Sequence, residues 1–273
     1  MLQQMAVCSW SLRPAHPQDL VRQLQSVGVH RVQLALDPLR ELPDRWKNVA
    51  ELFHQHGIHI VSGMFGCVGE DYTTMESIRR TGGIGPDGTW EQNWDRIRKD
   101  AALAHDLGLK LVTFHAGFLP ESTSDPKYRV LLQRLRQVAD LFGGRGIDLA
   151  LETGQESAKT LVRLLEHLTR PGVGVNLDPA NMILYGQDDP VEALHWLGPW
   201  IRQVHVKDAR RGEVPGVWGC EVTVGTGEVG WSKLLSRLQA AGFRGDYCIE
   251  CEAGERRVAD IRAAREFLEG IAA

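Results

Sequence analysis

The sequence predicts a single (β/α)8 barrel, the TIM-barrel architecture, that occupies the whole of residues 1–273. Short apolar runs typical of strands alternate eight times with amphipathic stretches typical of helices. Such alternation implies parallel strands joined by right-handed crossovers, and eight strand–helix units suit a closed barrel. A chain of 273 residues lies within the range of one such barrel, so its length requires no second domain.

The expected strands are short runs rich in aliphatic residues, and they lie at 5–9, 30–36, 58–64, 110–115, 147–152, 173–178, 201–206 and 246–250. Between them, apolar residues recur at spacings of three and four, which is typical of helices with one buried face. This helical pattern is clearest over 20–28, 130–142, 160–168 and 234–242. Several helical stretches end in glycine, which accepts the left-handed conformation that closes a helix. These glycines are Gly28, Gly57, Gly108, Gly146 and Gly242.

A doubly wound open sheet is the alternative fold for the same alternation. It would place a glycine-rich phosphate-binding loop directly after the first strand. The sequence at that place, CSWSLRPAHP over 8–17, contains no glycine. Two connections, 65–89 and 207–230, are long, and long connections after barrel strands usually form binding loops over the active face. We therefore favour the closed barrel.

The composition excludes several classes of protein. Net charge is −4, from 31 basic and 35 acidic residues, so the broad basic field of a nucleic-acid-binding protein is missing. No apolar run approaches the roughly 20 residues that span a bilayer, and the N-terminus does not resemble a signal peptide. We expect a cytoplasmic protein that contacts neither nucleic acid nor membrane. A chain of this length builds a large core without metal, so any bound metal is expected to be catalytic.

The five cysteines are odd in number, and only Cys248 and Cys251 are closely spaced. This pair lies in an apparent strand, where its two side chains would point to opposite faces. A second such pair, which would complete a zinc cage, is missing. We expect structural thiols in a reducing compartment.

Five consecutive expected strands end in a side chain that can bind metal or transfer a proton. In this fold the active site is built from the C-terminal ends of the strands. The five residues are His115, Glu152, Asp178, His205 and Glu250.

Strand parity supports a polar interior at these ends, because alternate residues of a strand share a face. Ala150 shares a face with Glu152, Asn176 with Asp178, and Gln203 with His205. The intervening Leu151, Leu177 and Val204 would then face the helices.

Taken alone, a carboxylate at a strand end is more often a helix cap or a surface residue. Three carboxylates buried together would cost several kcal/mol without a counter-charge, so a cation is their natural partner. Three carboxylates and one imidazole form a hard, oxygen-rich set of ligands. Such a set suits one divalent ion, Mn2+, Mg2+ or Co2+, with Zn2+ as an alternative.

The sequence resembles a known family, the sugar phosphate isomerases/epimerases with a xylose isomerase-like TIM barrel. The segments that carry the resemblance are LALETGQE, VNLDPANMILYG, VHVKDA, VGTGEVGW and CIECEAG. The resemblance implies that Glu152, Asp178, His205 and Glu250 bind the metal. It also implies that Glu152 and Glu250 move the proton, as their equivalents do in the ketose 3-epimerases.

The same superfamily contains DNA-repair endonucleases with three zinc ions. Those enzymes have a second His three residues after the Asp of strand six, where this chain has Asn181. They also have an Asp-x-His pair where this chain has Gly219 and Glu221. Because ligands of two zinc sites are replaced, we expect one metal ion and no action on DNA.

Further polar residues are expected at the substrate. Glu156 lies near the place of a substrate-binding Glu in the epimerases, although the spacing is inexact, and Arg211 lies where they have a substrate-binding Arg. Lys207 shares parity with His205 and could meet a substrate hydroxyl or be solvated. The expected substrate-binding residues are His115, Glu156, Asn181, Lys207 and Arg211. Three tryptophans are candidates to stack on a sugar ring, and they are Trp10, Trp90 and Trp218.

The expected reaction is proton abstraction beside a metal-polarised carbonyl, which gives a sugar isomerase or epimerase. The same enediolate can expel a neighbouring hydroxyl, so a dehydratase or lyase of a keto-inositol or 3-keto-sugar is the alternative. A barrel that binds sugar without catalysis is a remote third hypothesis. Glycine-rich turns next to Lys or Arg, which could bind a phosphate, are few, and 225–227 is the exception. This scarcity favours a sugar or polyol without phosphate. Pairing of copies of the chain would involve Trp196, Trp200 and Phe267.

Overall fold

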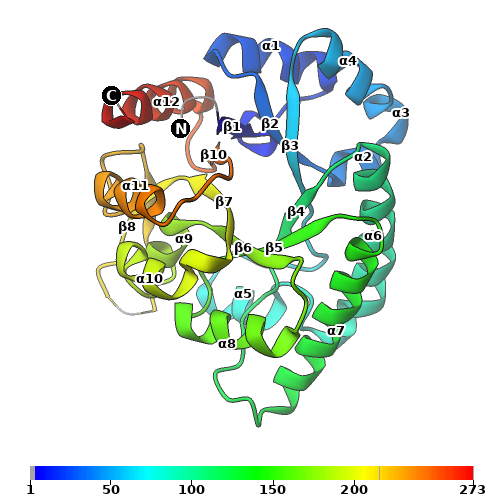
Figure 1. Cartoon of the computed structure of the whole chain (residues 1–273), viewed down its shortest axis with the longest axis vertical. Coiled ribbons are helices and arrows are strands. Elements are labelled where there is room, and N and C mark those ends of the chain that lie inside the picture. Colours follow the sequence, from blue (N-terminus) through cyan, green and yellow to red (C-terminus); the bar gives the residue numbers. More distant parts are fainter. Residues whose placement is uncertain (1–3, 215, 273) are drawn as a thin grey trace.

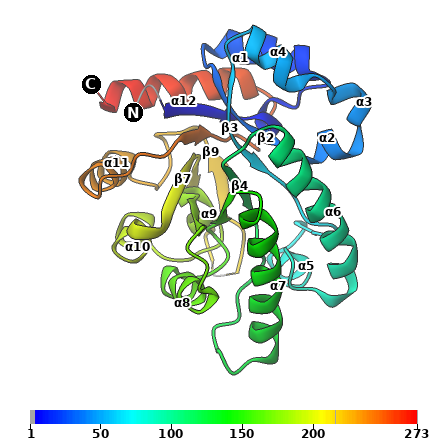
Figure 2. The same cartoon turned by 45° about the vertical axis from the view of Figure 1, so that its right-hand side comes forward.

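The eight strands of the barrel are all parallel and close in the order β1-β10-β7-β6-β5-β4-β3-β2, which confirms the predicted (β/α)8 barrel. The computed structural model describes residues 4–214 and 216–272. Helices surround the barrel on its outside (Figures 1 and 2). The first and last strands pair with each other, and the last helix, α12, packs beside the first, α1.

The barrel strands are β1 (Met5–Cys8), β2 (Arg31–Ala35), β3 (His59–Met64), β4 (Leu111–Phe114), β5 (Asp148–Glu152), β6 (Val173–Leu177), β7 (Ile201–Val206) and β10 (Tyr247–Ile249). The α-helices are α1 (Pro17–Val27), α2 (Asp37–Glu41), α3 (Pro43–Trp46), α4 (Val49–Gln55), α5 (Met75–Thr81), α6 (Asp87–Asp106), α7 (Pro126–Gly143), α8 (Ala158–Leu168), α9 (Pro179–Leu184), α10 (Pro190–Leu197), α11 (Trp231–Ala240) and α12 (Arg257–Ala272). Two 3-10 helices, Ser9–Leu12 and Gly198–Trp200, complete the elements around the barrel.

The long connections differ from the sequence expectation in their internal structure. The connection after β3 contains the helix α5, which begins with Thr74 as its cap. The connection after β7 folds into a two-stranded antiparallel sheet of β8 (Asp208–Arg210) and β9 (Cys220–Val222). The last barrel strand ends at Ile249, so Cys251 lies beyond it and the CxxC pair does not share a strand as expected.

All five glycines that were expected to end helices have positive φ angles, between 65° at Gly57 and 76° at Gly242. Gly28 illustrates the requirement, since it closes α1 in the left-handed conformation with φ 69°. A Cβ atom at this position would lie 2.2 Å from the Nη1 of Arg265 on α12. Glycine here therefore permits both the end of α1 and the close packing of α12.

The barrel separates an apolar outer layer from a polar inner one. Leu151, Leu177 and Val204 belong to the hydrophobic core formed by the strands and helices. Inside the barrel, Ser62 donates a hydrogen bond to Oε1 of Gln203 over 2.6 Å. The Nε2 of Gln203 in turn donates to Oδ1 of Asn176 over 3.3 Å. The barrel interior thus contains a connected layer of polar side chains, on which the site described below is built.

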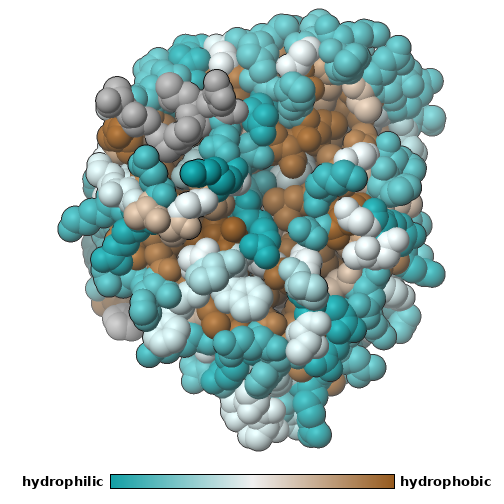
Figure 3. All heavy atoms as spheres, in the orientation of Figure 1, coloured by the Kyte–Doolittle hydropathy of each residue, from teal (hydrophilic) through white to brown (hydrophobic). Residues whose placement is uncertain are grey.

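The face seen in Figure 3 carries mostly hydrophilic residues, with hydrophobic ones visible in its hollows. No helix of the described residues is both long enough and apolar enough to cross a bilayer. Of the three residues expected at an interface between copies, Trp196 is exposed, and Lys159 lies over its ring at 4.9 Å. Trp200 and Phe267 are half-buried against the core. Oligomerisation therefore stays a prediction.

Candidate active site

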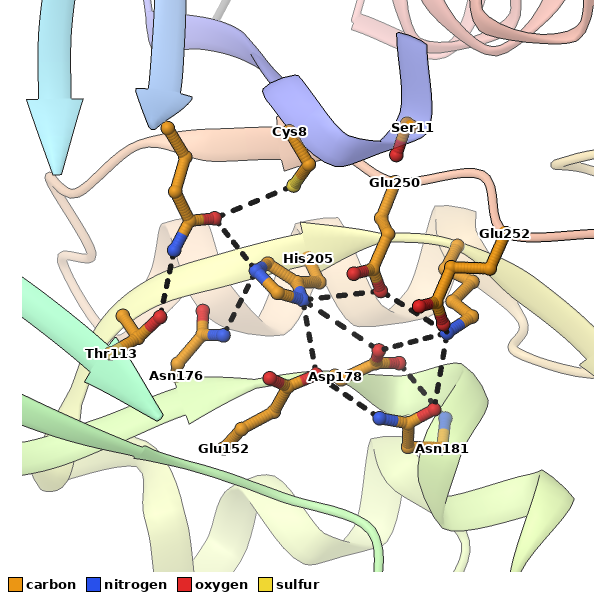
Figure 4. A network of polar contacts seen from close by, with 12 residues as sticks. Cys8, Ser11, Thr113, Glu152, Asn176, Asp178, Asn181, His205, Glu250 and Glu252 are labelled. Carbon is orange, nitrogen blue, oxygen red and sulfur yellow. Dashed lines mark hydrogen bonds and ion pairs between the residues drawn. The ribbon is translucent and has the colours of Figure 1, made fainter. Parts of the chain in front are cut away.

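Four side chains from four neighbouring strands meet inside the C-terminal end of the barrel (Figure 4). Glu152 is the last residue of β5, and His205 lies near the end of β7. Asp178 directly follows β6, and Glu250 directly follows β10. All four are buried, and one possible ligand atom from each lies within 4.8 Å of the others.

The Nδ1 atom of His205 is at the centre of this cluster. It lies 3.2 Å from Oε1 of Glu152 and 3.4 Å from Oε2 of Glu250. Oδ2 of Asp178 is slightly further away, at 3.7 Å. One oxygen of each carboxylate therefore lies within 3.7 Å of the same ring nitrogen.

The hydrogen bonding of the cluster fits a bound divalent cation. Within the described residues, three of its buried atoms lack a hydrogen-bond partner, namely Oε2 of Glu152, Oδ2 of Asp178 and Nδ1 of His205. Buried polar atoms are nearly always paired, so unpaired ones gathered in one place need an explanation. An ion bound by these atoms would satisfy all of them, and the oxygen-rich set suits a hard divalent metal.

The backbone around Asp178 explains how its carboxylate is aimed. Asp178 caps the N-terminus of α9, because its Oδ1 accepts the backbone N–H of Asn181 over 2.9 Å. Thr153 locks the same residue from the other side: its hydroxyl donates to the carbonyl of Asp178 and accepts its backbone N–H. With Oδ1 held by the helix, Oδ2 is left for the cluster.

Cationic groups in and beside the cluster offset part of the negative charge of its carboxylates. Burial alone would raise the pKa of Glu152, but the imidazoles of His115 and His205 hold it below its usual value. Burial would also raise the pKa of Glu250, but Lys207 and His205 lower it well below normal. Burial raises the pKa of Asp178 to about 6, although Lys207 opposes the shift. Two carboxylates are thus held ionised beside buried cationic groups.

Lys207 contacts both the four-residue cluster and Glu252. Its Nζ donates to Oε2 of Glu250 over 3.1 Å and to Oδ1 of Asn181 over 3.3 Å, and it also contacts the carboxylate of Glu252. Burial would lower the pKa of Lys207, but Glu250, Glu252 and Asp178 raise it well above normal. Its ammonium group is therefore a fixed positive charge beside Glu250.

Two residues of the cluster, Glu152 and Glu250, line a cavity of about 450 Å³. His115, Asn181 and Lys207 line this cavity, as expected for substrate-binding residues, together with Trp10 and Trp218. Trp90 does not line it and instead stacks on Trp94 with 5.6 Å between ring centroids. The full lining is Trp10, Ala35, Asp37, Met64, Phe65, Gly66, Glu70, Tyr72, His115, Glu152, Asn181, Leu184, Tyr185, Lys207, Trp218, Glu221, Glu250 and Glu252.

The structure does not bring Glu156 or Arg211 to this cavity. Glu156 is half-buried beside the start of α8, and burial raises its pKa to about 8. Arg211 is exposed, and its guanidinium donates to the carbonyl of Gln187 over 3.1 Å. Their assignment to substrate binding stays a prediction that the described contacts do not support.

Several residues of the cavity were not expected from the sequence. Glu252 lies two residues after Glu250, and this spacing is the feature of the sequence that could have predicted its place in the cavity. In the sequence, Glu221 stands where the DNA-repair endonucleases have a zinc-binding His. In the structure, its carboxylate accepts the backbone N–H of Glu252 over 2.9 Å. Glu70 and Tyr72 belong to the long connection after β3, where no periodic pattern marks them.

The glycine-rich turn at 225–227 is filled by a side chain of the protein itself. Oδ2 of Asp208 accepts the backbone N–H groups of Gly225 and Gly227 over 2.9 and 3.2 Å. Its Oδ1 accepts the N–H of Val229 over 3.2 Å. Backbone amides that converge on an anion can bind phosphate, but here a carboxylate already occupies them.

Residues 21–271 match the model of a protein family described as the xylose isomerase-like TIM barrel. The chain belongs to this family. Among solved members of similar fold, a xylose isomerase domain protein from Planctomyces limnophilus is 32% identical, with a TM-score of 0.85 over 92% of this chain and 91% of the other.

Two further proteins are similar to this chain, one in sequence and one in fold. The inosose dehydratase of Geobacillus kaustophilus (strain HTA426) is 31% identical over 175 residues, which cover 58% of this chain and 52% of the relative. The chain spans about half the length of the curated relatives that it matches. A D-allulose 3-epimerase from Methylomonas sp., solved with D-allulose, shares the fold at 14% identity, with a TM-score of 0.72 over 98% of this chain and 96% of the other.

Proposed function

We propose that this protein is a metal-dependent isomerase or epimerase that moves a proton beside the carbonyl of a keto-sugar or related polyol without phosphate. The observation that carries the proposal is the pair of buried carboxylates, Glu152 and Glu250. They flank His205 at 3.2 and 3.4 Å and both line the cavity. A substrate in this cavity would meet one carboxylate from β5, that of Glu152, and one directly after β10, that of Glu250.

Glu152, Asp178, His205 and Glu250 would hold one divalent ion, Mn2+, Co2+, Mg2+ or Zn2+. When bound, such an ion supplies Lewis-acid polarisation of a substrate carbonyl and a neighbouring hydroxyl. Glu152 and Glu250 act as the proton-transfer pair, one removing the proton from carbon and the other delivering one.

The surroundings of the two carboxylates differ, which favours different roles. Oε1 of Glu250 accepts the indole N–H of Trp10 over 2.7 Å, and its Oε2 accepts Lys207. Oε1 of Glu152 accepts the side-chain amide of Asn181 over 3.1 Å, and its Oε2 lies 3.3 Å from Nε2 of His115. Glu250 is therefore held in its charged form by a lysine, while Glu152 lies beside an imidazole, that of His115, without a hydrogen bond to it.

The charge of the cavity supports a substrate without phosphate. Among the described residues that line it, Lys207 is the one lysine or arginine, and Glu250 and Glu252 already neutralise it. The acidic lining residues are Asp37, Glu70, Glu152, Glu221, Glu250 and Glu252. Even with a divalent ion present, a phosphate would meet an excess of negative charge at short range. The aromatic rings of Trp10 and Tyr185 offer apolar faces for a sugar or cyclitol ring.

A dehydratase is the second candidate function, and the similarity to an inosose dehydratase favours it. The reaction begins with the same removal of a proton beside the carbonyl. The C–O bond of a neighbouring hydroxyl then breaks, and that oxygen leaves as water with a proton from an acid. Lys207 and His115 are the cavity residues that could supply this proton. A barrel that binds a sugar without catalysis is the remote third hypothesis.

Deuterium exchange tests the proposal. Metal-loaded protein is incubated in D2O with D-allulose or with an inosose, and the products are separated and examined by mass spectrometry. We expect carbon-bound deuterium in recovered substrate or product, because each candidate reaction breaks a C–H bond. An epimer identifies the first function and a dehydrated product the second. Tight binding without any deuterium incorporation would instead support the sugar-binding barrel.

A further inference from the structure

The polar layer beneath the four-residue cluster includes a glutamine, Gln33, that contacts His205. Gln33 lies on β2, on the opposite side of His205 from the carboxylates, and it is fully buried. Its Oε1 lies 2.8 Å from Nε2 of His205. The two ring nitrogens of His205 therefore face different environments, with carboxylates at Nδ1 and an amide oxygen at Nε2.

We infer that Gln33 is a positioning residue, which holds the Nε2–H of His205 and so reserves the lone pair of Nδ1 for the metal ion. The inference rests on the metal site proposed above. A histidine that binds metal through one nitrogen must carry its hydrogen on the other. The partner of that hydrogen fixes both the tautomer and the orientation of the ring.

The amide of Gln33 is itself held in the orientation that this role requires. Its Nε2 donates to the hydroxyl of Thr113 over 2.8 Å, and the thiol of Cys8 donates to its Oε1 over 3.4 Å. Both contacts place the oxygen, and not the nitrogen, toward His205. Thr113 and Cys8 belong to β4 and β1, so three strands besides β7 contribute to the arrangement.

Asn176 is the other polar group at Nε2 of His205, and it cannot take the same role. Its Nδ2 lies 3.0 Å from Nε2, whereas its Oδ1 already accepts the amide of Gln203. An amide nitrogen cannot accept a hydrogen bond. Once Nδ1 gives up its proton to a metal ion, Gln33 is the acceptor in place for Nε2–H.

The arrangement explains why a costly polar side chain lies inside the barrel. A buried amide is tolerated only when its hydrogen bonds are satisfied. Gln33 satisfies them by joining His205 to Thr113 and Cys8. Without its oxygen, the imidazole could rotate or place its hydrogen on Nδ1, and either change would weaken the metal site.

The test compares Gln33→Met, which removes the acceptor at similar volume, with Gln33→Glu, which keeps an acceptor oxygen in the same place. Gln203→Met is the matched control, because Gln203 is buried in the same layer but bonds Ser62 and Asn176. The probe is Zn2+ alone, whose affinity is measured by calorimetry. The spectroscopic readout is the ring N–H of His205 in the 1H–15N NMR spectrum of the zinc-loaded protein.

We expect Gln33→Met to weaken zinc binding about 10–100-fold, the usual effect of losing such a partner. The slowly exchanging Nε2–H signal of His205 should also disappear. Gln33→Glu should keep the signal, and Gln203→Met should keep both the signal and the affinity. The inference is overturned if Gln33→Met retains both, or if Gln203→Met loses as much affinity. Wild-type protein that binds no zinc would refute the metal site itself and this inference with it.

Discussion

The ammonium group of Lys207 lies 3.1 Å from Oε2 of Glu250, and both side chains are buried. Each group keeps the other charged, because a buried ion without a partner would be strongly disfavoured. The contact joins a residue expected to bind substrate to one expected to bind metal and move a proton. If Glu250 transfers a proton as proposed, we expect this contact to set the pH range in which it does so.

Replacing Lys207 with Met should raise the pKa of Glu250, because burial would then act without the lysine that opposes it. The acid limb of the pH–rate profile for deuterium exchange should therefore move to higher pH. The maximum rate should also fall, by about 10²-fold if Lys207 stabilises an oxyanion or acts as an acid. Lys159→Met, at an exposed lysine over Trp196, is the control and should leave the profile unchanged. An unshifted acid limb in Lys207→Met would show that this contact does not govern Glu250.

The metal site predicts one ion per chain. Elemental analysis of protein purified without chelator should give about one divalent ion, and three zinc ions per chain would contradict the prediction. The variants Asp178→Asn and His205→Ala should bind the metal far more weakly. They should still fold, because the barrel core is built from other residues. Circular dichroism separates this outcome from simple unfolding.

The sequence predicted the barrel because strand-like and helix-like patterns alternate eight times and five helical stretches end in glycine. Strand ends such as Glu152 and His205 could be predicted because a strand places alternate residues on one face. The sheet of β8 and β9 could not be, because strands of three residues are too short to show an alternating pattern.

The rest of the cavity depends on contacts between distant parts of the chain. Glu70 is held by the backbone N–H of Gly83 over 2.9 Å, a contact within an irregular connection. Glu156 and Arg211 show the opposite case, since their spacing pointed to the substrate but the loops direct them elsewhere. Strand parity places a side chain only while the strand continues, and loops follow no such rule.

The variant Glu156→Gln tests whether Glu156 binds substrate and how its burial affects stability. Burial raises the pKa of Glu156 from about 4.5 to about 8, so between these values the unfolded chain releases a proton that the folded chain keeps. The wild-type carboxyl therefore reduces stability increasingly as pH rises through this window, and the full penalty is present above it. The variant should be more stable than the wild type at about pH 8.5 and nearly equal to it near pH 4.5 in urea unfolding. Because Glu156 is half-buried, the gain should be modest. An unchanged KM would place Glu156 outside substrate binding, whereas a large rise in KM would restore the sequence prediction.

The proposed proton-transfer pair, Glu152 and Glu250, gives the most direct prediction. Glu250→Gln keeps an oxygen that can bind the ion but removes the base, so most of the metal should remain while exchange falls about 10²–10⁴-fold. Glu152→Gln should behave similarly, since both carboxylates line the cavity beside His205. Glu252→Gln is the matched comparison, because Glu252 also contacts Lys207 but does not belong to the four-residue cluster. It should keep the metal and lose less activity than either of the other variants.

The alternative is that Glu152 and Glu250 only hold the ion. In that case both glutamine variants would exchange deuterium at nearly the wild-type rate once metal is added to saturation. The lower exchange rate seen without added metal would then reflect weaker metal binding alone. Measuring exchange at several metal concentrations separates the two cases, because excess metal restores a weakened site but cannot replace a missing base. A rate that recovers fully with metal would remove both residues from the chemistry. A rate that stays low while the metal content is full would assign them to it.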